Sequence, residues 1–489
     1  MSRSLRIAAG QALSRAAGAP LVAGNAVELL RDAAENYPAW LEAIRGAKRW
    51  IHFESYIIHD DASGRRFADA LIERARAGVQ VRVMYDWLGG LGSAWPRFWR
   101  RLAAGGVNVR VFNPPSLRSP LSWLSRDHRK MLAVDGEVAF VTGLCVGDCW
   151  VGNPERGIDP WRDTGVSLRG PAVADVEAAF AEIWGHAGPP LPPEELVDGA
   201  AIPAAGDIAL RVIATEPSTA SVFRLDQLIA AVARERLWIT DAYFVGVSAY
   251  VQALIAAARD GVDVRLLVPG GSDLAFVQPL SRAGYRALLA NGIRVFEWNG
   301  PMVHAKTAVA DGRWARVGST NLNVQSWLGN WELDVAIEDE GFAHRMEAMY
   351  EQDLEHATEV ILEARRVRRV GPEPPKRRRG KRIGRGSGSA SRAAAGALRL
   401  GNTFGAALTS RRQLGAAESW TLLYGALLTL ALGGIAIKWP KGLAWPIGVL
   451  LLWMGGTWLY DAWRLWRAGR QAAASKSPDD GDHQTVDLK

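Results

Sequence analysis

The chain has 489 residues, of which 58 are basic and 51 acidic, a formal net charge of +7, and an apolar fraction of 48%. At roughly 100 to 200 residues per domain, this length predicts two to four folding units. The composition excludes a wholly disordered, collagen-like or coiled-coil chain. The two cysteines, Cys145 and Cys149, are too few for a disulfide framework or a self-contained structural zinc site, so we expect ordinary small residues in a reducing compartment.

Residues 1–24 carry three arginines and no acid. They contain no apolar run long enough for the core of a signal peptide, so cleavage and export are not expected. The segment fits two descriptions equally well: an amphipathic helix lying on a lipid surface, or a frayed tail.

The middle of the chain repeats itself. Residues 49–56 predict a strand, followed by a helix and a second strand at 78–84, and the same order recurs at 236–243 and 261–267. The alternation of strand and helix favours parallel, helix-covered sheets built twice, an α/β fold. In this comparison Glu54 and Asp241 fall at matched positions near the ends of the opening strands.

A proline-rich stretch separates the two copies. We therefore predict a first domain at 25–187 and a second at 205–364. Residues 365–412 are predicted to be a basic flexible linker, because they are rich in Arg, Gly, Pro and Ser and residues 365–385 alone hold eleven basic residues against one acid.

Two uncharged stretches, 420–437 and 442–460, follow the linker. Each is about long enough to cross roughly 30 Å of hydrocarbon, and tryptophans and tyrosines gather near their ends. We predict a transmembrane helical hairpin at 419–460 and a tail at 461–489. Arginines on both sides of the hairpin place both ends in the cytoplasm by the positive-inside bias. A re-entrant hairpin and two buried core helices are the alternatives.

A histidine–lysine motif lies at the same point of each repeat. In the second copy the pattern H-x-K-x4-D-x6-G-S-x-N contains His304, Lys306, Asp311, Ser319 and Asn321. In a strand the His and the Lys share one face, while the residue between them points away. That face therefore carries a potential nucleophile beside a fixed cation.

The first copy contains His128, Lys130 and Asp135. Two such faces brought together suit a phosphodiester: one imidazole attacks phosphorus, the other protonates the leaving oxygen, and lysines stabilise the charged oxygens without a metal. Each imidazole needs a carboxylate to fix its tautomer. We assign Glu332 to His304 and Asp163 to His128 as the candidate orienting groups.

The two motifs resemble those of the phospholipase D superfamily, and the segments 161–173 and 281–297 are similar to its bacterial cardiolipin synthase branch. The resemblance implies two pseudo-twofold-related phospholipase D-like α/β/α domains, a covalent phosphatidyl-histidine intermediate and transfer of the phosphatidyl group to a lipid hydroxyl. It also implies His128 as nucleophile and His304 as general acid. The site residues it implies are catalytic His128, Lys130, Asp135, His304, Lys306 and Asp311, and phosphate-binding Ser319 and Asn321.

The first copy departs from the family pattern at Thr142, Gly143 and Cys145, where Gly, a small residue and Asn are usual. Gly143 lacks a hydroxyl, and the Cys145 thiol is a poorer donor than an amide, so the symmetry of the phosphate cradle is in doubt. The aspartates Asp135 and Asp311 complete the motifs, although their spacing predicts turn-fixing at the strand end rather than proton transfer. The remaining histidines lack the motif, and we expect them to be surface or packing residues.

Three functions fit the sequence: a transferase making cardiolipin from phosphatidylglycerol and a second phospholipid, a hydrolytic phospholipase D, and a membrane-tethered nuclease. The nuclease is disfavoured because the positive charge is confined to one segment instead of being spread over the folded domains. We expect phospholipid and membrane partners, no nucleic acid, no cofactor and no metal. The hairpin predicts an inner-membrane protein with a cytoplasmic catalytic domain; the oligomeric state is not predicted.

Overall fold

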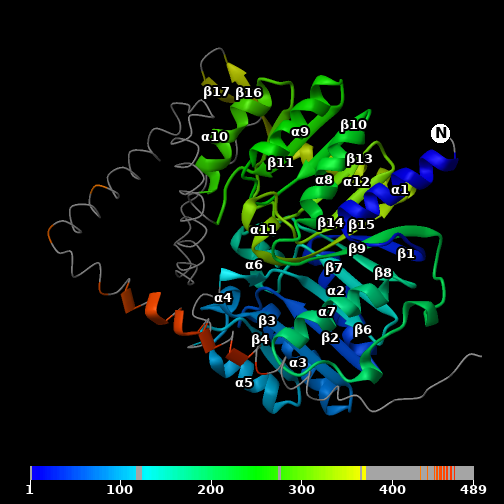
Figure 1. Cartoon of the computed structure of the whole chain (residues 1–489), viewed down its shortest axis with the longest axis vertical. Coiled ribbons are helices and arrows are strands. Elements are labelled where there is room, and N and C mark those ends of the chain that lie inside the picture. Colours follow the sequence, from blue (N-terminus) through cyan, green and yellow to red (C-terminus); the bar gives the residue numbers. More distant parts are fainter. Residues whose placement is uncertain are drawn as a thin grey trace, which may run out of the picture. The chain divides into compact units, whose positions relative to one another are not determined.

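The structure is a computed structural model that describes residues 3–116, 124–273, 277–363 and 366–370, together with scattered helical residues between 430 and 467. It divides into two compact units, one of residues 1–114 and 123–417 and one of residues 115–122 and 418–489. The first unit contains two similar halves, each built on a mixed sheet (Figure 1).

The sheet of the first half has the strand order β4-β3-β2-β6-β7-β8-β1. Its strands are β1 (Val22–Arg31), β2 (Trp50–Ser55), β3 (Gln80–Asp86), β4 (Asn108–Phe112), β6 (Lys130–Val134), β7 (Val138–Thr142) and β8 (Thr164–Arg169), with the short β5 (Arg126–Asp127) before β6. Its helices are α2 (Asp32–Gly46), α3 (Ala62–Arg76), α4 (Trp87–Gly90), α5 (Pro96–Ala104), α6 (Asp148–Val151) and α7 (Val173–His186).

The second half repeats this order as β12-β11-β10-β13-β14-β15-β9, and β1 pairs with β9 between the halves. Its strands are β9 (Ile208–Thr215), β10 (Arg236–Thr240), β11 (Asp263–Pro269), β12 (Arg294–Trp298), β13 (Thr307–Ala310), β14 (Trp314–Gly318) and β15 (Asn330–Glu338), with β16 (Ala357–Glu363) and β17 (Arg366–Val370) beyond β12. Its helices are α8 (Ser221–Val232), α9 (Ser248–Arg259), α10 (Val277–Leu289), α11 (Val324–Leu328) and α12 (Glu340–Glu355).

The expectation of parallel sheets is correct for only three strands of each half: β2, β3 and β4, and β10, β11 and β12. The strands that follow each motif are antiparallel, because a tight turn joins them. In the turn from β6 to β7 Asp135 and Gly136 both have positive φ, and Glu137 N–H donates to Val134 O (2.9 Å). Asp311 and its following glycine repeat the turn. Asp-Gly with positive φ at both positions is typical of a hairpin.

The helices pack on the sheets through three apolar clusters. The central cluster lies between the two sheets and contains side chains from both sheets and from helices α7 and α12. One outer cluster joins the first sheet to α2, α3 and α5, and the other joins the second sheet to α8, α9 and α10 (Figure 1). The halves thus share one core, and the α/β/α order holds in each of them.

The opening strands of the two halves, β2 and β10, correspond in a register that differs by one residue from the register read from the sequence. Asp135 accepts the backbone N–H groups of residues 48 to 50, whereas Asp311 accepts those of residues 234 to 236. Glu54 therefore corresponds to Thr240, and Asp241 to Ser55. The match of Glu54 with Asp241 was wrong, because the two strand sequences resemble each other in both of the registers that differ by one residue.

Two terminal predictions also change. Residues 3–17 form α1 (Arg3–Ala17), which packs on α8 and β9: Arg224 of α8 donates to Ala16 O (3.2 Å), Arg211 of β9 donates to Gly10 O (3.1 Å) and to Ser14 Oγ (3.3 Å), and Ala17 is buried. The described part of the segment is thus a helix and not a frayed tail, and its contact with a lipid surface stays a prediction. The start of the predicted linker forms β17, antiparallel to β16, where Glu363 faces Arg366 across the strands.

Most of the predicted membrane hairpin, 419–460, lies outside the described residues. Among the residues that are described, no helix combines the length and the apolar character needed to span a bilayer.

Candidate active site

The two motifs begin on opposite halves of the molecule. His128 lies just before β6, and its backbone N–H donates to Trp331 O (2.8 Å) in β15 of the second half. His304 lies before β13, and its N–H donates to Arg162 O (2.6 Å), just before β8 of the first half. These bonds cross between the halves, so each histidine is held by backbone that follows the motif of the other copy.

The carboxylates cross in the same way. Glu332 Oε2 lies 2.8 Å from His128 Nδ1, and Asp163 Oδ2 lies 2.7 Å from His304 Nδ1. Both acids predicted from sequence therefore contact a motif histidine, but the predicted pairing was reversed. The reason is topological: β15 and the segment before β8 each pair with the start of the opposite motif strand. Sequence proximity within one half was the wrong guide.

The lysines lie beside the histidines, and the residue between them points away. Lys130 Nζ donates to His128 O (2.5 Å), and Lys306 Nζ lies 3.2 Å from His304 Nε2. Arg129, in contrast, donates to Ala179 O (2.7 Å) in α7, on the other face of the strand. This alternation agrees with the strand pattern read from the sequence.

Burial lowers the pKa of both imidazoles, and the two lysines add to the effect. The pKa of His304 falls to about 4 and that of His128 falls well below its ordinary value. Before substrate binds, each ring is therefore neutral near pH 7, and with a carboxylate on Nδ1 the proton sits there, which places the lone pair on Nε2. Burial also lowers the pKa of Lys306, to about 8, and the positive charge of Lys130 contributes. The positive charges of the two lysines therefore repel each other across the site.

The two carboxylates differ in their electrostatics. Burial raises the pKa of Glu332 to about 7, although Lys130 and the Ser319 hydroxyl oppose the rise. Burial acts in the same direction on Asp163, but His304 and Lys306 outweigh it and hold the pKa of that carboxyl below its usual value. The two carboxylates therefore occupy equivalent positions in the two halves, but their pKa values are shifted in opposite directions.

The residues predicted to bind phosphate have different surroundings. The Ser319 hydroxyl donates to Glu332 Oε2 (2.6 Å), so it contacts the acid behind His128. Asn321 is buried, and its Oδ1 has no hydrogen-bond partner among the described residues. Its counterpart Cys145 is also buried and free, and the Cys145 carbonyl accepts the Tyr37 hydroxyl (2.7 Å). Because the unpaired Asn321 atom is an acceptor, it suits a donor group of a substrate rather than a phosphoryl oxygen.

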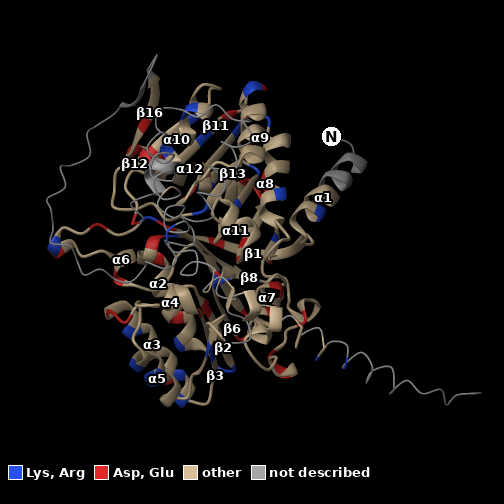
Figure 2. Ribbon diagram, turned by 60° about the vertical axis from the view of Figure 1, so that its left-hand side comes forward, with Lys and Arg blue, Asp and Glu red and all other residues tan. Residues whose placement is uncertain are grey.

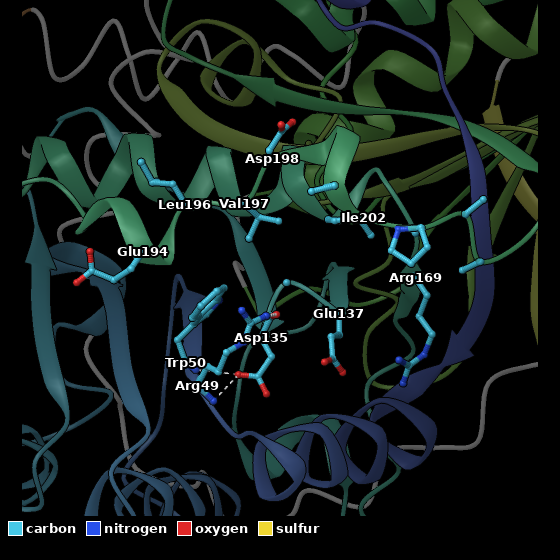
Figure 3. Close-up of a pocket in the computed structure, with 16 residues that line it drawn as sticks. Arg49, Trp50, Asp135, Glu137, Arg169, Glu194, Leu196, Val197, Asp198 and Ile202 are labelled. Carbon is cyan, nitrogen blue, oxygen red and sulfur yellow. Dashed lines mark hydrogen bonds between the residues drawn. The ribbon is translucent and has the colours of Figure 1, made fainter.

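Asp135 and Asp311 lie at the far ends of the motif strands. At about 3.3 Å per residue, five positions separate Lys130 from Asp135 by roughly 17 Å. Figure 3 shows Asp135 beside Arg49 and Trp50 in a surface groove of about 580 Å³ next to the segment that joins the halves. Asp135 fixes the start of β2 there, so its grouping with the catalytic residues was wrong, and the same holds for Asp311. The groove is not the catalytic site.

Aromatic rings enclose the histidines. Tyr56 lies 4.8 Å from His128 between ring centroids, and Tyr243 lies 5.8 Å from His304. Trp150 and Trp161 contact His304 at 5.6 Å and 5.7 Å. None of these four aromatic residues was expected at the site from the sequence. The tyrosines follow the opening strands of both repeats, and this repetition could have revealed them; no repeat marks the tryptophans.

In the described part of the chain, no group of three or more His, Cys, Asp or Glu side chains is arranged to hold a metal ion. The motif side chains that carry positive charge beside the histidines are Lys130 and Lys306. The arrangement can therefore activate one imidazole as nucleophile and the other as acid, with ammonium groups as counter-charge.

Comparison with known proteins agrees with this geometry. A family profile described as "Cardiolipin synthase, PLD-like domain" matches residues 40–146 and 226–354, which contain both motifs. Cardiolipin synthase A of Pseudomonas aeruginosa (strain LESB58) is 38% identical over 372 residues, covering 74% of this chain and 73% of the relative. The chain belongs to the cardiolipin synthase family.

Other relatives of this family member support the same placement. Cardiolipin synthase A of Pseudomonas syringae pv. syringae (strain B728a) is 34% identical over 384 residues, covering 76% of this chain and 78% of the relative. Among solved structures, phosphatidylserine synthase of Haemophilus influenzae Rd KW20 superimposes with a TM-score of 0.56 at 15% identity, covering 72% of this chain and 91% of the other. At that identity the likeness establishes the fold.

Proposed function

We propose that this cardiolipin synthase family member is a phosphatidyltransferase that forms cardiolipin from phosphatidylglycerol and a second phospholipid through a phosphatidyl-histidine intermediate. The observation that carries the proposal is the crossed pair of imidazoles, each with a carboxylate on Nδ1 and a lysine beside it. Two such groups supply the nucleophile and the acid that two successive displacements at phosphorus need.

In the first displacement His128 Nε2 attacks phosphorus and the bond from phosphorus to the headgroup oxygen breaks. His304 supplies the proton that the leaving alkoxide takes up: the negative charge of the bound phosphodiester favours the imidazolium, so His304 enters this step protonated on both nitrogens and becomes neutral when Nε2 gives up its proton. The low pKa of His128 keeps its ring neutral, so the lone pair is present at pH 7. Lys130 and Lys306 stabilise the negative charge on the phosphoryl oxygens. Folding has already buried these ammonium groups and fixed their positions, so they need not reorganise when the substrate binds.

In the second displacement a lipid hydroxyl attacks the phosphatidyl group on His128. His304, neutral after the first step, takes the hydroxyl proton, the phosphorus–nitrogen bond breaks and the new phosphodiester forms. The assignment of His128 as nucleophile is part of the proposal. Trapping of phosphohistidine on His304 alone would reverse the two roles.

The test is incubation of the purified enzyme with labelled phosphatidylglycerol, followed by separation of cardiolipin from phosphatidic acid. We expect labelled cardiolipin. Phosphatidic acid as the main product would mean that water is the acceptor, and the enzyme would then be a hydrolytic phospholipase D that uses the same residues.

A nuclease is disfavoured by the charge of the folded unit. Basic and acidic residues are interspersed along the ribbon of both halves (Figure 2), whereas a nucleic-acid groove needs a continuous positive surface.

Lysine ammonium groups replace a metal in the proposed mechanism, so activity should survive exhaustive chelation with EDTA. Loss of activity that one divalent ion restores would contradict the mechanism.

We further propose that residues 419–460 anchor the enzyme in the inner membrane as a helical hairpin, with the catalytic unit in the cytoplasm. The support is the two uncharged stretches, their aromatic ends and the flanking arginines. The preceding basic segment adds attraction to an anionic leaflet, on the order of 1 kcal/mol per basic residue near the surface.

A further inference from the structure

The acids behind the two histidines receive different donors. Glu332 accepts the Ser319 hydroxyl (2.6 Å) on Oε2 and the Asn330 side-chain amide (3.0 Å) on Oε1. Asp163 accepts the Thr164 backbone N–H (2.9 Å) on Oδ1 and the Trp150 indole N–H (3.1 Å) on Oδ2. In each half, then, one oxygen holds the imidazole and also takes a second side-chain donor.

The first half cannot use a serine for this purpose. Pairing of β6 with β7 and of β13 with β14 makes Gly143 the counterpart of Ser319. A Cβ at Gly143 would overlap Oδ1 of Asp163. Asp163 is one methylene shorter than Glu332, so its carboxylate reaches His304 from a position closer to the strand backbone. The missing hydroxyl follows from this placement, and its role must pass to another donor.

Trp150 lies where that donor is needed. It sits in α6, it is 2% exposed, and its ring meets that of His304 edge-on at 5.6 Å. The short helix is held at its first residue: Asp148 N–H donates to Asp61 Oδ2 (2.7 Å), and Asp148 Oδ1 accepts Ser63 N–H (2.9 Å). The indole N–H is thereby aimed at Asp163 by a fixed backbone.

We propose that Trp150 is a positioning residue that replaces the serine hydroxyl in the first half: its indole N–H orients and stabilises the Asp163 carboxylate, which in turn holds His304. The proposal deepens the proposed function, since it concerns how the same site keeps His304 ready for proton transfer. Loss of a donor to a buried charged acceptor should lower turnover by roughly tenfold to a hundredfold.

The test variant is Trp150→Phe, which keeps an aromatic wall against His304 and removes the N–H. We expect kcat to fall by that factor with KM nearly unchanged. The acid limb of kcat/KM should move to higher pH, because a carboxylate with one donor fewer requires a higher pH to ionise. The control is Trp161→Phe, since Trp161 contacts the same imidazole but donates no hydrogen bond to Asp163 among the described contacts. It should leave the acid limb in place.

A double-mutant cycle separates positioning from packing. If Trp150 acts through Asp163, Trp150→Phe should have little further effect in an Asp163→Ala background. An equal loss in both backgrounds, or a wild-type acid limb in Trp150→Phe, would overturn the proposal. Thermal melting of each variant identifies any loss caused by unfolding.

The assay should follow release of the headgroup alcohol, which transfer and hydrolysis share. If the wild type releases headgroup but makes phosphatidic acid, the proposed transferase function fails while the Trp150 comparison stands. If cardiolipin forms normally in Trp150→Phe, the transferase function stands and the Trp150 proposal fails.

Discussion

His128 and His304 each offer a substrate one ring nitrogen while the other is bonded to a carboxylate from the opposite half. Each histidine has its own carboxylate, so neither histidine can take the place of the other. In the proposed mechanism the two side chains act as one catalytic unit, so a change in either is expected to stop the same reaction.

Alanine at His128 or at His304 should lower turnover by roughly a thousandfold or more, and the double variant should be little worse than the single ones. The physical reason is that attack without proton transfer, or proton transfer without attack, accomplishes neither displacement. Turnover of labelled phosphatidylglycerol measures the effect. His344→Ala, an exposed histidine in α12, is the control, and losses that multiply would contradict a shared site.

The pH profile should report Lys306. Its pKa of about 8 means that the ammonium is charged below that pH and neutral above it. The counter-charge for phosphate is lost as pH rises through 8, so kcat/KM should fall on the alkaline side. In Lys306→Arg the charge persists to much higher pH, and the alkaline limb should disappear even if turnover is lower. An unchanged limb in this variant would assign it to another group.

The sequence identifies the reacting residues because chemistry limits their types and the repeat marks their places. It does not identify which acid serves which histidine, since Asp163 and Glu332 follow their motifs at similar points of the two copies. That pairing depends on strand contacts between the halves. Trp150 escaped notice for a related reason: its counterpart in the second copy, Ser326 in α11, is a residue of another type, so the sequence repeat does not mark it, and its role becomes visible only beside Asp163.

At the scale of elements, each motif strand is fixed at both ends. Its catalytic end is bonded to the opposite half, and its other end is the Asp-Gly turn whose aspartate accepts three backbone N–H groups. Asp135 thus joins the turn to the start of β2. The Asp-Gly dipeptide is a strong hairpin signal that, weighed more heavily, would have predicted the antiparallel strands from the sequence.

Asp135→Ala should destabilise the protein by about 2 to 4 kcal/mol, because three backbone N–H groups, that of Trp50 fully buried, lose their acceptor and alanine is strained at positive φ. Chemical denaturation measures the loss. At temperatures where the variant is folded, kcat should remain within roughly threefold of wild type, since the carboxylate is far from the histidines. Glu137→Ala, in the same turn but exposed, is the control. A large loss of kcat in a fully folded Asp135→Ala would restore a catalytic role.

At the scale of the whole molecule, catalysis and membrane attachment belong to different stretches of the chain. The two halves share one core with the catalytic centre where they meet, and β17 closes the sheet edge at Val370. The uncharged stretches begin some fifty residues later, at residue 420. The chemistry and the anchor should therefore be separable.

A chain truncated after Val370 should keep its fold and its activity on detergent-dispersed lipid but lose activity on vesicles, increasingly so at high salt. Detergent brings the substrate to the site, whereas on vesicles only weak, salt-sensitive attraction would remain. Turnover on both substrates, with circular dichroism as the folding control, measures this. Full activity on vesicles would remove the case for an anchor, and inactivity in detergent would make the hairpin part of the catalytic fold.

The reciprocal contacts between the halves are those of an isologous dimer: His128 meets Glu332 as His304 meets Asp163, and the backbone bonds repeat the exchange. Such contacts arise naturally when one gene encodes two identical subunits. Joining the copies in one chain releases them from identity, because a substitution then changes one acid and leaves the other alone. Ser319 on one side, and Gly143 with Trp150 on the other, are differences of this kind within otherwise matching sites.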